Sequence, residues 1–373
     1  MKIVLAPDKF KNSLTGMEFC DAVEEGFKAE HRNVDMVKLP LADGGDGTIE
    51  VVNYYLQGNV IKIEVNNPFF KPVVASYLYS EISKIAFIEM AEASGVKLLQ
   101  KAQFDCVHAT TLGTGEMIVD ALNKGAKTII LGIGGSATND CGIGMATALG
   151  YKFLDDEGHE VKPIGRNLSI ITTIDDSKVN QKLKGVSFNI ACDVSNPLYG
   201  SEGAAYVYAQ QKGASIEDIA FLDQGLKDFS KVLSKKFSID PQTIKGAGAA
   251  GGMGIASKLF LSGLLKPGIE LIKSLANFDS KIENADWIIT GEGSLDEQTF
   301  SGKTINGVLT SAKEKQIKVA ALCGTSELSN KSAKASGIDY VDTVMNYSKG
   351  MDDAMKNSTY YVKMMAKKFA KEL

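Results

Sequence analysis

Residues 286–304 of this 373-residue chain are DWIITGEGSLDEQTFSGKT. The apolar run 287–289 is typical of a strand buried on both faces of an α/β sheet, and a glycine-rich loop follows it directly. Open α/β folds bind ligands in loops at the carboxyl ends of their strands. This loop contains Glu292 and Asp296, whose carboxylates suit a hydrated divalent cation, and Lys303, whose ammonium group suits phosphate. The stretch therefore predicts an α/β fold and indicates phosphoryl transfer.

The two ends of the chain share one pattern, and the middle has another. Strand-like and helix-like runs alternate over residues 2–56 and again in the C-terminal part, which predicts a parallel sheet. Three β-rich runs within 59–91 are separated by short turns, which is typical of a mixed sheet. We predict two α/β domains with a ligand cleft between them. The first is a discontinuous parallel-sheet (Rossmann- or flavodoxin-like) domain of residues 1–70 and 280–373, and the second is a mixed-sheet domain inserted at 71–279.

Composition limits the class of protein. A hydrophobic fraction of 44% and a charged fraction of 23% are typical of soluble globular proteins. The net charge of −4 argues against a nucleic-acid partner, although magnesium can mediate between acidic side chains and a nucleotide. Three histidines and no G-x-S-x-G motif argue against zinc or serine-hydrolase chemistry. With no apolar run of 18 residues and no C-x-x-C pair, we expect a cytoplasmic protein with reduced thiols and no membrane partner.

The segment APDKFKNSLT near the N-terminus contains groups suited to binding an anion. Lys9, Lys11 and Ser13 precede a helix whose start is marked by Thr15 and Glu18 at capping-box spacing. Unpaired N–H groups at a helix start, with lysines beside them, form an anion site. A solvated loop with surface lysines also fits this pattern.

Two loops with aspartates each allow two interpretations. LADGGDGTIE places Asp43 and Asp46 on one glycine turn, where they fit either a magnesium or hydroxyl site or a tight turn with an N-cap. FNIACDVSNPLYG ends an apolar run at Asp193, which Asn196 follows. These two residues suit metal coordination or deprotonation of a hydroxyl, and equally an Asx-turn before proline.

The segment KTIILGIGGSATNDCGIG ends a strand in a glycine loop and leads through polar residues to a helix. Its GIGGSA, and GAGAAG at 246–251, match the loose dinucleotide-binding pattern G-x-G-x-x-[GA], a weak signal in each case. An NAD(P)-dependent oxidoreductase of a small hydroxy acid is therefore one alternative function, and a non-catalytic sugar-acid-binding module is another. The SGKT at 301–304 is not a Walker A motif, because Glu297 stands where that motif needs glycine, yet Lys303 at a helix start still suits phosphate.

Taken together, these loops resemble the bacterial glycerate kinase family of the glycerate 2-kinase type. The matching segments occur in the family's order from residue 6 to beyond 300, and they are APDKFKNSL, ADGGDGT, GIGGSATNDCGIG, ACDVSNPLYG, GAGAAGGMG and TGEGSLDEQTFSGKT. The resemblance implies phosphorylation of D-glycerate with ATP and Mg²⁺, at the 2-hydroxyl, giving 2-phosphoglycerate. It also implies two α/β domains with a discontinuous first domain.

Phosphoryl transfer requires alignment of the reactants and neutralisation of charge on the transferred group. We expect Lys9, Lys11 and Ser13 to contact phosphate or the substrate carboxylate. The candidates for magnesium ligation and for the base are Asp193, Glu292 and Asp296, with Asp193 favoured as the base. The remaining candidate contacts to substrate or phosphate are Asp43, Asp46, Gly134, Gly135, Ser136, Asn139, Asp140, Asn196 and Lys303. The sequence leaves the oligomeric state open.

Overall fold

The computed structural model describes residues 1–44, 48–300 and 304–373. The chain divides into two compact units: unit 1 comprises residues 1–55 and 267–373, and unit 2 comprises residues 56–266. The sequence predicts division near residues 70 and 280 instead. β3 (Asn59–Asn66) pairs along its whole length with β4 (Pro72–Ser80), so its hydrogen bonds place it in unit 2. The predicted fold class, a parallel-sheet α/β unit with a mixed-sheet α/β insertion, is confirmed.

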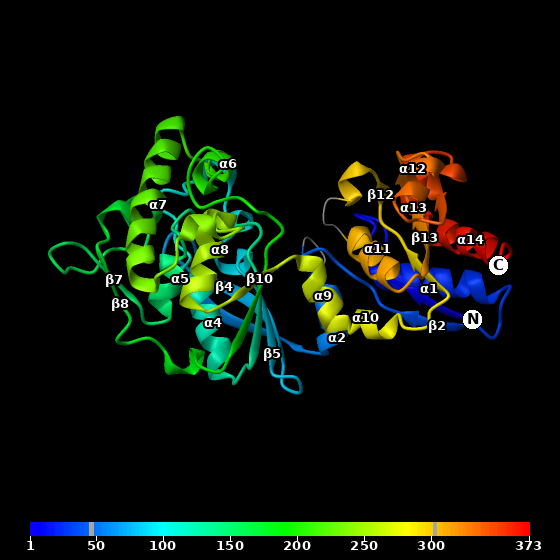
Figure 1. The fold of residues 1–373 in the computed structure, drawn as a ribbon, viewed down its shortest axis with the longest axis horizontal. Coiled ribbons are helices and arrows are strands. Elements are labelled where there is room, and N and C mark those ends of the chain that lie inside the picture. The colour runs from blue at the N-terminus through cyan, green and yellow to red at the C-terminus, as the bar shows by residue number, and fades with distance from the viewer. Residues whose placement is uncertain (45–47, 301–303) are drawn as a thin grey trace. The chain divides into compact units, whose positions relative to one another are not determined.

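Unit 1 is built on a five-stranded sheet in which every pair is parallel. The strand order is β15-β13-β11-β1-β2, which in chain order is the flavodoxin-like arrangement 2-1-3-4-5. Of these strands, β2 and β13 are labelled in Figure 1. Ligands of such sheets bind outside the carboxyl ends of the strands, at the point where the connections from two neighbouring strands run in opposite directions. In this sheet that point lies between β1 and β11. The strands are β1 (Lys2–Leu5), β2 (Asp35–Lys38), β11 (Trp287–Thr290), β13 (Lys318–Cys323) and β15 (Tyr340–Thr343), with a short parallel ladder of β12 (Ser294–Leu295) and β14 (Thr325–Ser326).

Helices cover both faces of this sheet. Ile3, Leu5 and Ile289 share one core with residues of α1 and α14. Val4 and Ile288 point to the opposite face, since successive strand residues alternate, and they are also fully buried; α11 contacts β11 and β13. The helices of unit 1 are α1 (Gly16–Lys28), α2 (Thr48–Leu56), α9 (Gly268–Ala276), α10 (Phe278–Lys281), α11 (Thr304–Glu314), α12 (Asn330–Ala335), α13 (Met351–Lys356) and α14 (Ser358–Ala370).

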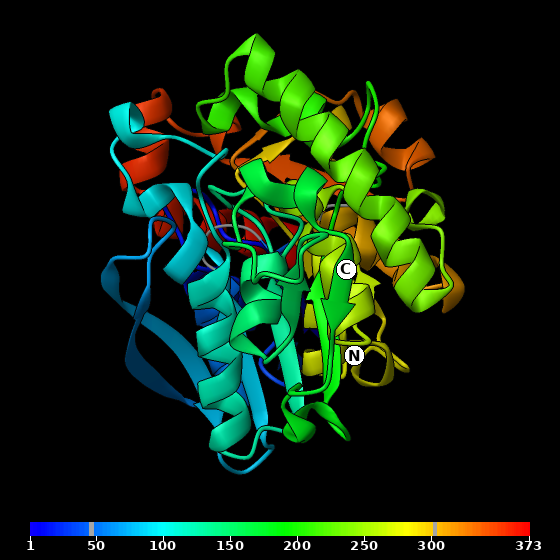
Figure 2. The same ribbon diagram turned by 90° about the vertical axis from the view of Figure 1, so that its left-hand side faces the viewer.

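Unit 2 is built on a six-stranded mixed sheet in the order β10-β9-β6-β5-β4-β3. The first three strands along the chain form an antiparallel meander, and β5, β6, β9 and β10 are parallel. Figure 2 turns this unit toward the viewer, with the long helix α7 in green. Its further strands are β5 (Ile85–Glu89), β6 (Thr128–Gly132), β9 (Ser187–Ala191) and β10 (Leu264–Lys266), and a separate hairpin joins β7 (Lys152–Leu154) to β8 (Thr173–Asp175).

The helices of unit 2 enclose a large apolar core with the sheet. They are α3 (Ala91–Ser94), α4 (Leu112–Asn123), α5 (Ile143–Ala148), α6 (Ala204–Tyr208), α7 (Ile216–Phe237) and α8 (Ala249–Phe260). Within the described parts of the chain, no helix is both long enough and apolar enough to cross a membrane. All five cysteines are free thiols.

Candidate active site

Asp8 lies directly after β1, at the carboxyl edge of the unit 1 sheet. Its backbone N–H donates to the carbonyl of Gly291, 2.9 Å away, so the loops that follow β1 and β11 are joined. Its carboxylate accepts hydrogen bonds from the Lys9 backbone, 2.7 Å away, and from the hydroxyl of Thr304 at the start of α11. Burial raises the pKa of Asp8, the Thr304 hydrogen bond lowers it and the charge of Asp43 raises it, which together place this pKa at about 6. A carboxyl group with such a pKa, at the point where this fold binds ligands, is a functional-site candidate.

In the loop after β11, one threonine forms hydrogen bonds with both predicted carboxylates. Thr299 donates its hydroxyl to Glu292 Oε1 at 2.6 Å and its backbone N–H to Asp296 Oδ1 at 3.1 Å. The same hydroxyl accepts from the Asp296 backbone N–H at 3.1 Å. Thr299 is almost completely buried, so it fixes this part of the loop. Asp296 also borders a cavity of about 650 Å³ that contains further carboxylates.

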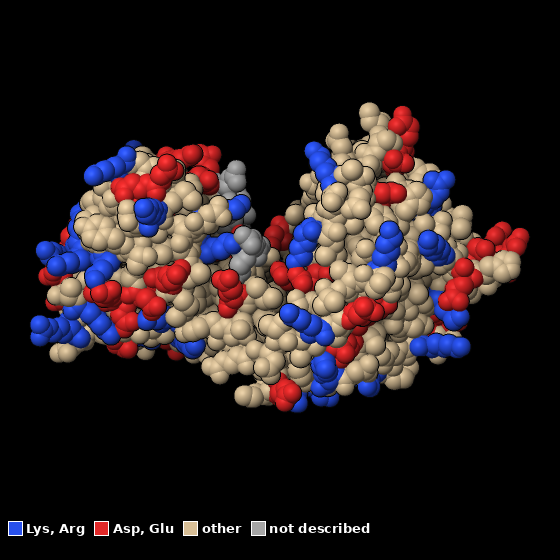
Figure 3. Space-filling model, turned by 180° about the vertical axis from the view of Figure 1, so that it is seen from behind, with Lys and Arg blue, Asp and Glu red and all other residues tan. Residues whose placement is uncertain are grey.

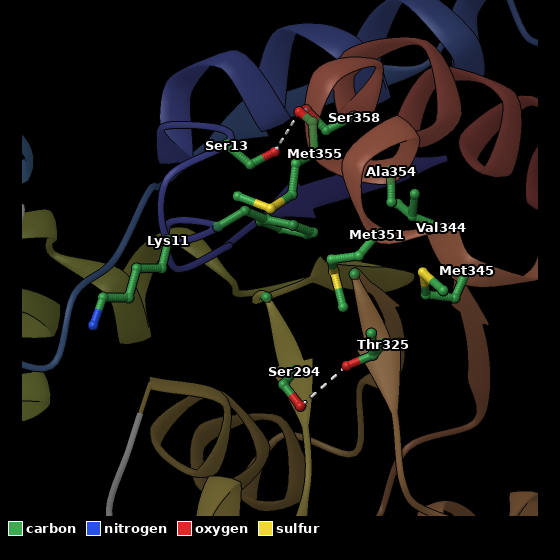
Figure 4. A pocket seen from close by; sticks show the side chains of 13 residues that line it. Lys11, Ser13, Ser294, Thr325, Val344, Met345, Met351, Ala354, Met355 and Ser358 are labelled. Carbon is green, nitrogen blue, oxygen red and sulfur yellow. Dashed lines mark hydrogen bonds between the residues drawn. The ribbon is translucent and has the colours of Figure 1, made fainter. Parts of the chain in front are cut away.

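The remaining predicted residues of the N-terminal loop lie on the same edge. Lys11 is exposed, and the Ser13 hydroxyl donates to the carbonyl of Met355 in α13 at 3.2 Å. Both residues line a cavity of about 410 Å³ bounded by the loops after β1, β11, β13 and β15 (Figure 4). Lys9 is half-buried beside Asp8. The structure therefore brings together Lys9, Lys11, Ser13, Asp43, Glu292 and Asp296 within unit 1.

In unit 2, the predicted contact Asp140 is an internal carboxylate. It is completely buried and accepts four hydrogen bonds: from the Thr111 backbone and hydroxyl, both at 2.8 Å, and from the backbones of Gly142 and Gly144 at 3.1 and 3.2 Å. Burial raises the pKa of Asp140, and the four donors oppose this. The sequence predicts a ligand contact here, whereas the structure shows a group that joins two segments of the unit. Asp140 as a ligand contact stays a prediction, and its four internal hydrogen bonds also give it a structural role.

The other predicted residues of this loop differ in exposure, because Ser136 and Asn139 are buried and the two glycines are not. Gly134 and Gly135 are exposed, and nothing lies within 4 Å of the place that a Gly134 Cβ would occupy. Ser136 accepts a hydrogen bond at 2.7 Å from the buried Lys212, which also donates to the Thr138 carbonyl at 2.8 Å. Burial lowers the pKa of Lys212 to about 8. Among the described residues, neither the amide oxygen nor the amide nitrogen of the buried Asn139 has a hydrogen-bond partner.

Asp193 and Asn196 follow β9 and differ in their surroundings. Asp193 is exposed beyond the carboxyl end of the strand. Asn196 donates to the carbonyl of Glu202 at 2.8 Å and accepts from the Tyr208 hydroxyl at 2.6 Å, so both ends of its amide hold the loop together. An Asx-turn would direct the Leu198 backbone N–H to Asn196, but that group donates to Gln242 instead, at 3.2 Å. Asp193 stays a candidate base.

Neither dinucleotide-like motif has the geometry of a Rossmann fingerprint, in which the glycines lead from a strand into a helix. The first follows β6, but α5 begins only at Ile143. The second follows a 3₁₀ turn, and residues 250–252 of α8 are in the left-handed region, with φ of 52°, 73° and 92°. The oxidoreductase alternative therefore has no structural support at either motif.

Several functional candidates carried weak sequence signals or lie outside the described residues. Asp46 and Lys303 fall among the residues that the structure does not describe. The sequence offers a reason to select Asp8, because this residue follows a strand just as Asp193 does. It offers no comparable reason to select Thr299 or Lys212. Over the described residues, no three His, Cys, Asp or Glu side chains form a metal-binding group. Figure 3 shows charges of both signs interspersed on the visible face.

Comparison with known proteins decides the family. The model of the glycerate kinase family matches residues 3–373. The chain belongs to the glycerate kinase family. The glycerate kinase of Bacillus cereus is 42% identical over 370 residues, covering 99% of this chain and 97% of the relative. The glycerate 2-kinase of Escherichia coli is 40% identical over 358 residues, covering 96% and 94%.

A solved structure agrees with this family assignment. A crystal structure from Salmonella typhimurium LT2, whose description names glycerate kinase 2, matches with a TM-score of 0.89 and 39% identity. The match covers 100% of this chain and 98% of that one. The resemblance of the loops to glycerate kinases is thus confirmed, and family membership makes this protein an enzyme of the kinase class.

Proposed function

We propose that this protein transfers the γ-phosphoryl group of ATP to the 2-hydroxyl of D-glycerate in a magnesium-dependent reaction that yields 2-phosphoglycerate. The observation that carries the proposal is the grouping of Asp8, Lys9, Lys11, Glu292 and Asp296 at the carboxyl edge of a flavodoxin-like sheet, in a member of the glycerate kinase family. The name glycerate 2-kinase of the Escherichia coli relative supports the 2-hydroxyl as acceptor. We also propose that the protein acts in the cytoplasm.

Unit 1 supplies groups that suit the nucleotide phosphates. Lys9 and Lys11 can neutralise phosphate charge, which is the principal requirement of phosphoryl transfer. Glu292 and Asp296 suit Mg²⁺, because this cation commonly takes one or two carboxylates and completes its shell with water and phosphate oxygens. Thr299 contacts both residues and so fits the role of a group that orients metal ligands. Bound magnesium would neutralise charge on the phosphates.

Unit 2 supplies groups that suit the small acid. Leaving the buried Asn139 amide unpaired is costly, roughly 1–3 kcal/mol for each unsatisfied group, so a ligand that pairs with it gains free energy. Gly134, Gly135 and Ser136 stand beside it in sequence and provide polar backbone and hydroxyl groups. Asp193 would accept the proton of the reacting hydroxyl.

An assay of ADP release tests this proposal. With ATP and Mg²⁺, D-glycerate should stimulate ADP release, and 3-hydroxypropionate, which lacks the 2-hydroxyl, should not. A thermal-shift titration separates the alternatives, since ATP with Mg²⁺ should stabilise the protein by mass action and NADH should leave its melting temperature unchanged. ADP release that does not depend on D-glycerate, or stabilisation by NADH alone, would overturn the proposal.

A further inference from the structure

The cavity at the carboxyl edge of unit 1 is largely apolar. Its volume of about 410 Å³ lies in the range of small-molecule sites, roughly 300–1,000 Å³. Phe10, from the loop after β1, and Met345, which follows β15, contribute to its wall together with Met351 and Met355 of α13 (Figure 4). The cavity thus combines side chains from both ends of the chain into one apolar surface.

The three methionines of this cavity are exposed, which is unusual for this residue type. The exposed fractions are 36% for Met345, 54% for Met351 and 39% for Met355. Apolar side chains gathered in one exposed patch mark a binding site for a ligand or partner. Methionine is flexible and polarisable, and its sulfur makes favourable contacts with aromatic rings. The patch therefore suits a flat aromatic ligand.

The parts of the two reactants differ in the free energy that they would lose on leaving water for such a cavity. Glycerate contains a carboxylate and two hydroxyl groups, and the phosphates of ATP are multiply charged. Burying these groups against methionine and phenylalanine without partners is costly. The nucleobase is flat, aromatic and uncharged, so it is the part of either reactant that the cavity can take up.

One edge of the cavity is polar, and it leads to the phosphate-binding candidates. The Lys11 backbone nitrogen lies 3.8 Å from the place that a Gly293 Cβ would occupy, so the loops after β1 and β11 meet there. In Figure 4 the Lys11 side chain extends away from the methionines. Ser13 and Ser358 both donate to the Met355 carbonyl, at 3.2 and 3.3 Å, which holds α13 against this edge. A base inside the cavity would place its phosphates toward Lys9, Lys11 and Glu292.

We propose that this cavity binds the purine base of the nucleotide, with Met351 and Met355 in contact with the ring. The inference rests on the proposed kinase function and adds to it the place where the nucleotide is held. It assigns a binding role to α13, whose residues show no catalytic pattern in the sequence. It also explains why α13 leaves methionines exposed on the same edge as the charged loops.

Methyl NMR of methionine tests the proposal without any need for turnover. The chain contains 12 methionines. With methyl-labelled methionine, adenosine and ATP should shift the resonances of Met345, Met351 and Met355 through ring currents and leave the other nine in place. Inorganic tripolyphosphate has no base and should leave these three resonances unmoved. Shifts that depend on protein concentration without nucleotide would instead reveal self-association through this surface, and would overturn the proposal.

Steady-state kinetics of Met351→Asp provide the second arm. A carboxylate at this exposed position would lose hydration against the base and removes the apolar contact, but it leaves the core intact. KM for ATP should therefore rise on the order of tenfold while KM for D-glycerate stays the same. The matched control is Tyr360→Asp in α14, at a residue that is 63% exposed and does not line the cavity; its constants should match wild type.

The two arms separate this inference from the function on which it rests. If ATP supports glycerate-dependent turnover, yet the three methyl groups stay in place and Met351→Asp keeps the wild-type KM for ATP, the base binds elsewhere and only the inference fails. If ATP neither binds nor reacts, the proposed function fails and the inference with it.

Discussion

Asp140 in unit 2 and Asp8 in unit 1 both lie in loops beyond the carboxyl ends of buried parallel strands, but their surroundings differ. Asp140 is completely buried and accepts four hydrogen bonds from its own unit. Asp8 accepts hydrogen bonds from the Lys9 backbone and Thr304 and lies near a second carboxylate, while burial raises the pKa of both aspartates compared. A carboxylate that accepts four internal hydrogen bonds stabilises the fold, whereas one with fewer internal donors, at the ligand-binding edge of its sheet, is the better candidate for chemistry. Position beyond a strand is therefore a weaker sign of function than the number of internal hydrogen bonds that the carboxylate accepts.

The largest effect that this comparison predicts is on folding. Asp140→Ala removes the acceptor of four buried donors, at roughly 1–3 kcal/mol for each unsatisfied group, so the free energy of unfolding should fall by about 3 kcal/mol or more. Urea titration measures this loss, with Asp193→Ala as the matched variant that should unfold like wild type. An Asp140→Ala protein of unchanged stability that has lost its activity would place Asp140 in the chemistry instead.

The next effect concerns the exposed aspartate of the same unit. Asp193→Asn should lower kcat on the order of 10²-fold, because the amide cannot accept the hydroxyl proton, while the fold stays intact. Initial-rate kinetics with circular dichroism check both statements. The control is Asp156→Asn, at an exposed residue in a turn of unit 2, which should keep its kcat. A wild-type kcat for Asp193→Asn would refute its assignment as base.

A smaller effect, on the pH dependence of stability, tests Asp8. Its folded-state pKa of about 6 lies above the ordinary value of 3.8, so the folded protein binds more protons than the unfolded chain between about pH 4 and pH 6. The free energy of unfolding of wild type minus that of Asp8→Asn should therefore fall as pH rises through this window and stay constant above it. The fall should be roughly 2–3 kcal/mol, since one pKa unit corresponds to about 1.36 kcal/mol. Urea titrations from pH 4 to pH 8 provide the measurement. A difference that does not vary with pH would show that Asp8 is ordinarily ionised.

The smallest effect concerns the residue that joins Glu292 to Asp296. Thr299→Val keeps the buried shape but removes the hydroxyl, so the apparent affinity for Mg²⁺ should fall about tenfold, the lower end of the range for groups that orient metal ligands. Thr299→Ser restores the hydroxyl and should restore the affinity. The concentration of Mg²⁺ that gives half-maximal rate is the quantity to compare. Equal values in Thr299→Val and wild type would remove this threonine from the metal site.

Local patterns in the sequence were sufficient to predict the fold. The apolar run at 287–289 is strand β11, and the capping box of Thr15 and Glu18 begins α1 as predicted, with the Thr15 side chain accepting from the Glu18 backbone. The C-terminal segment is an exception. Its sequence pattern predicts one helix over 351–371, whereas the structure divides this segment into α13 and α14 at residue 357, where φ is −113°.

The site was harder to predict, because its decisive contacts join residues far apart in the chain. Asp8 accepts a hydrogen bond from Thr304, nearly three hundred residues later in the chain. Asp140 accepts its four hydrogen bonds from Thr111, Gly142 and Gly144. Lysines and glycines in a loop can be recognised from the sequence, but the number of hydrogen bonds that a carboxylate receives cannot. The predicted groups of unit 1 therefore stand together, while Asp140 and Asn196 are committed to internal bonds.

The proposed reaction is the phosphorylation of D-glycerate at its 2-hydroxyl. Phosphorus NMR of the products, after incubation with ATP, Mg²⁺ and D-glycerate, tests the reaction and the position together. We predict resonances of ADP and 2-phosphoglycerate in equal amounts. A spectrum with 3-phosphoglycerate would contradict the position, and one with only ATP, or with ADP and inorganic phosphate, would contradict the reaction itself.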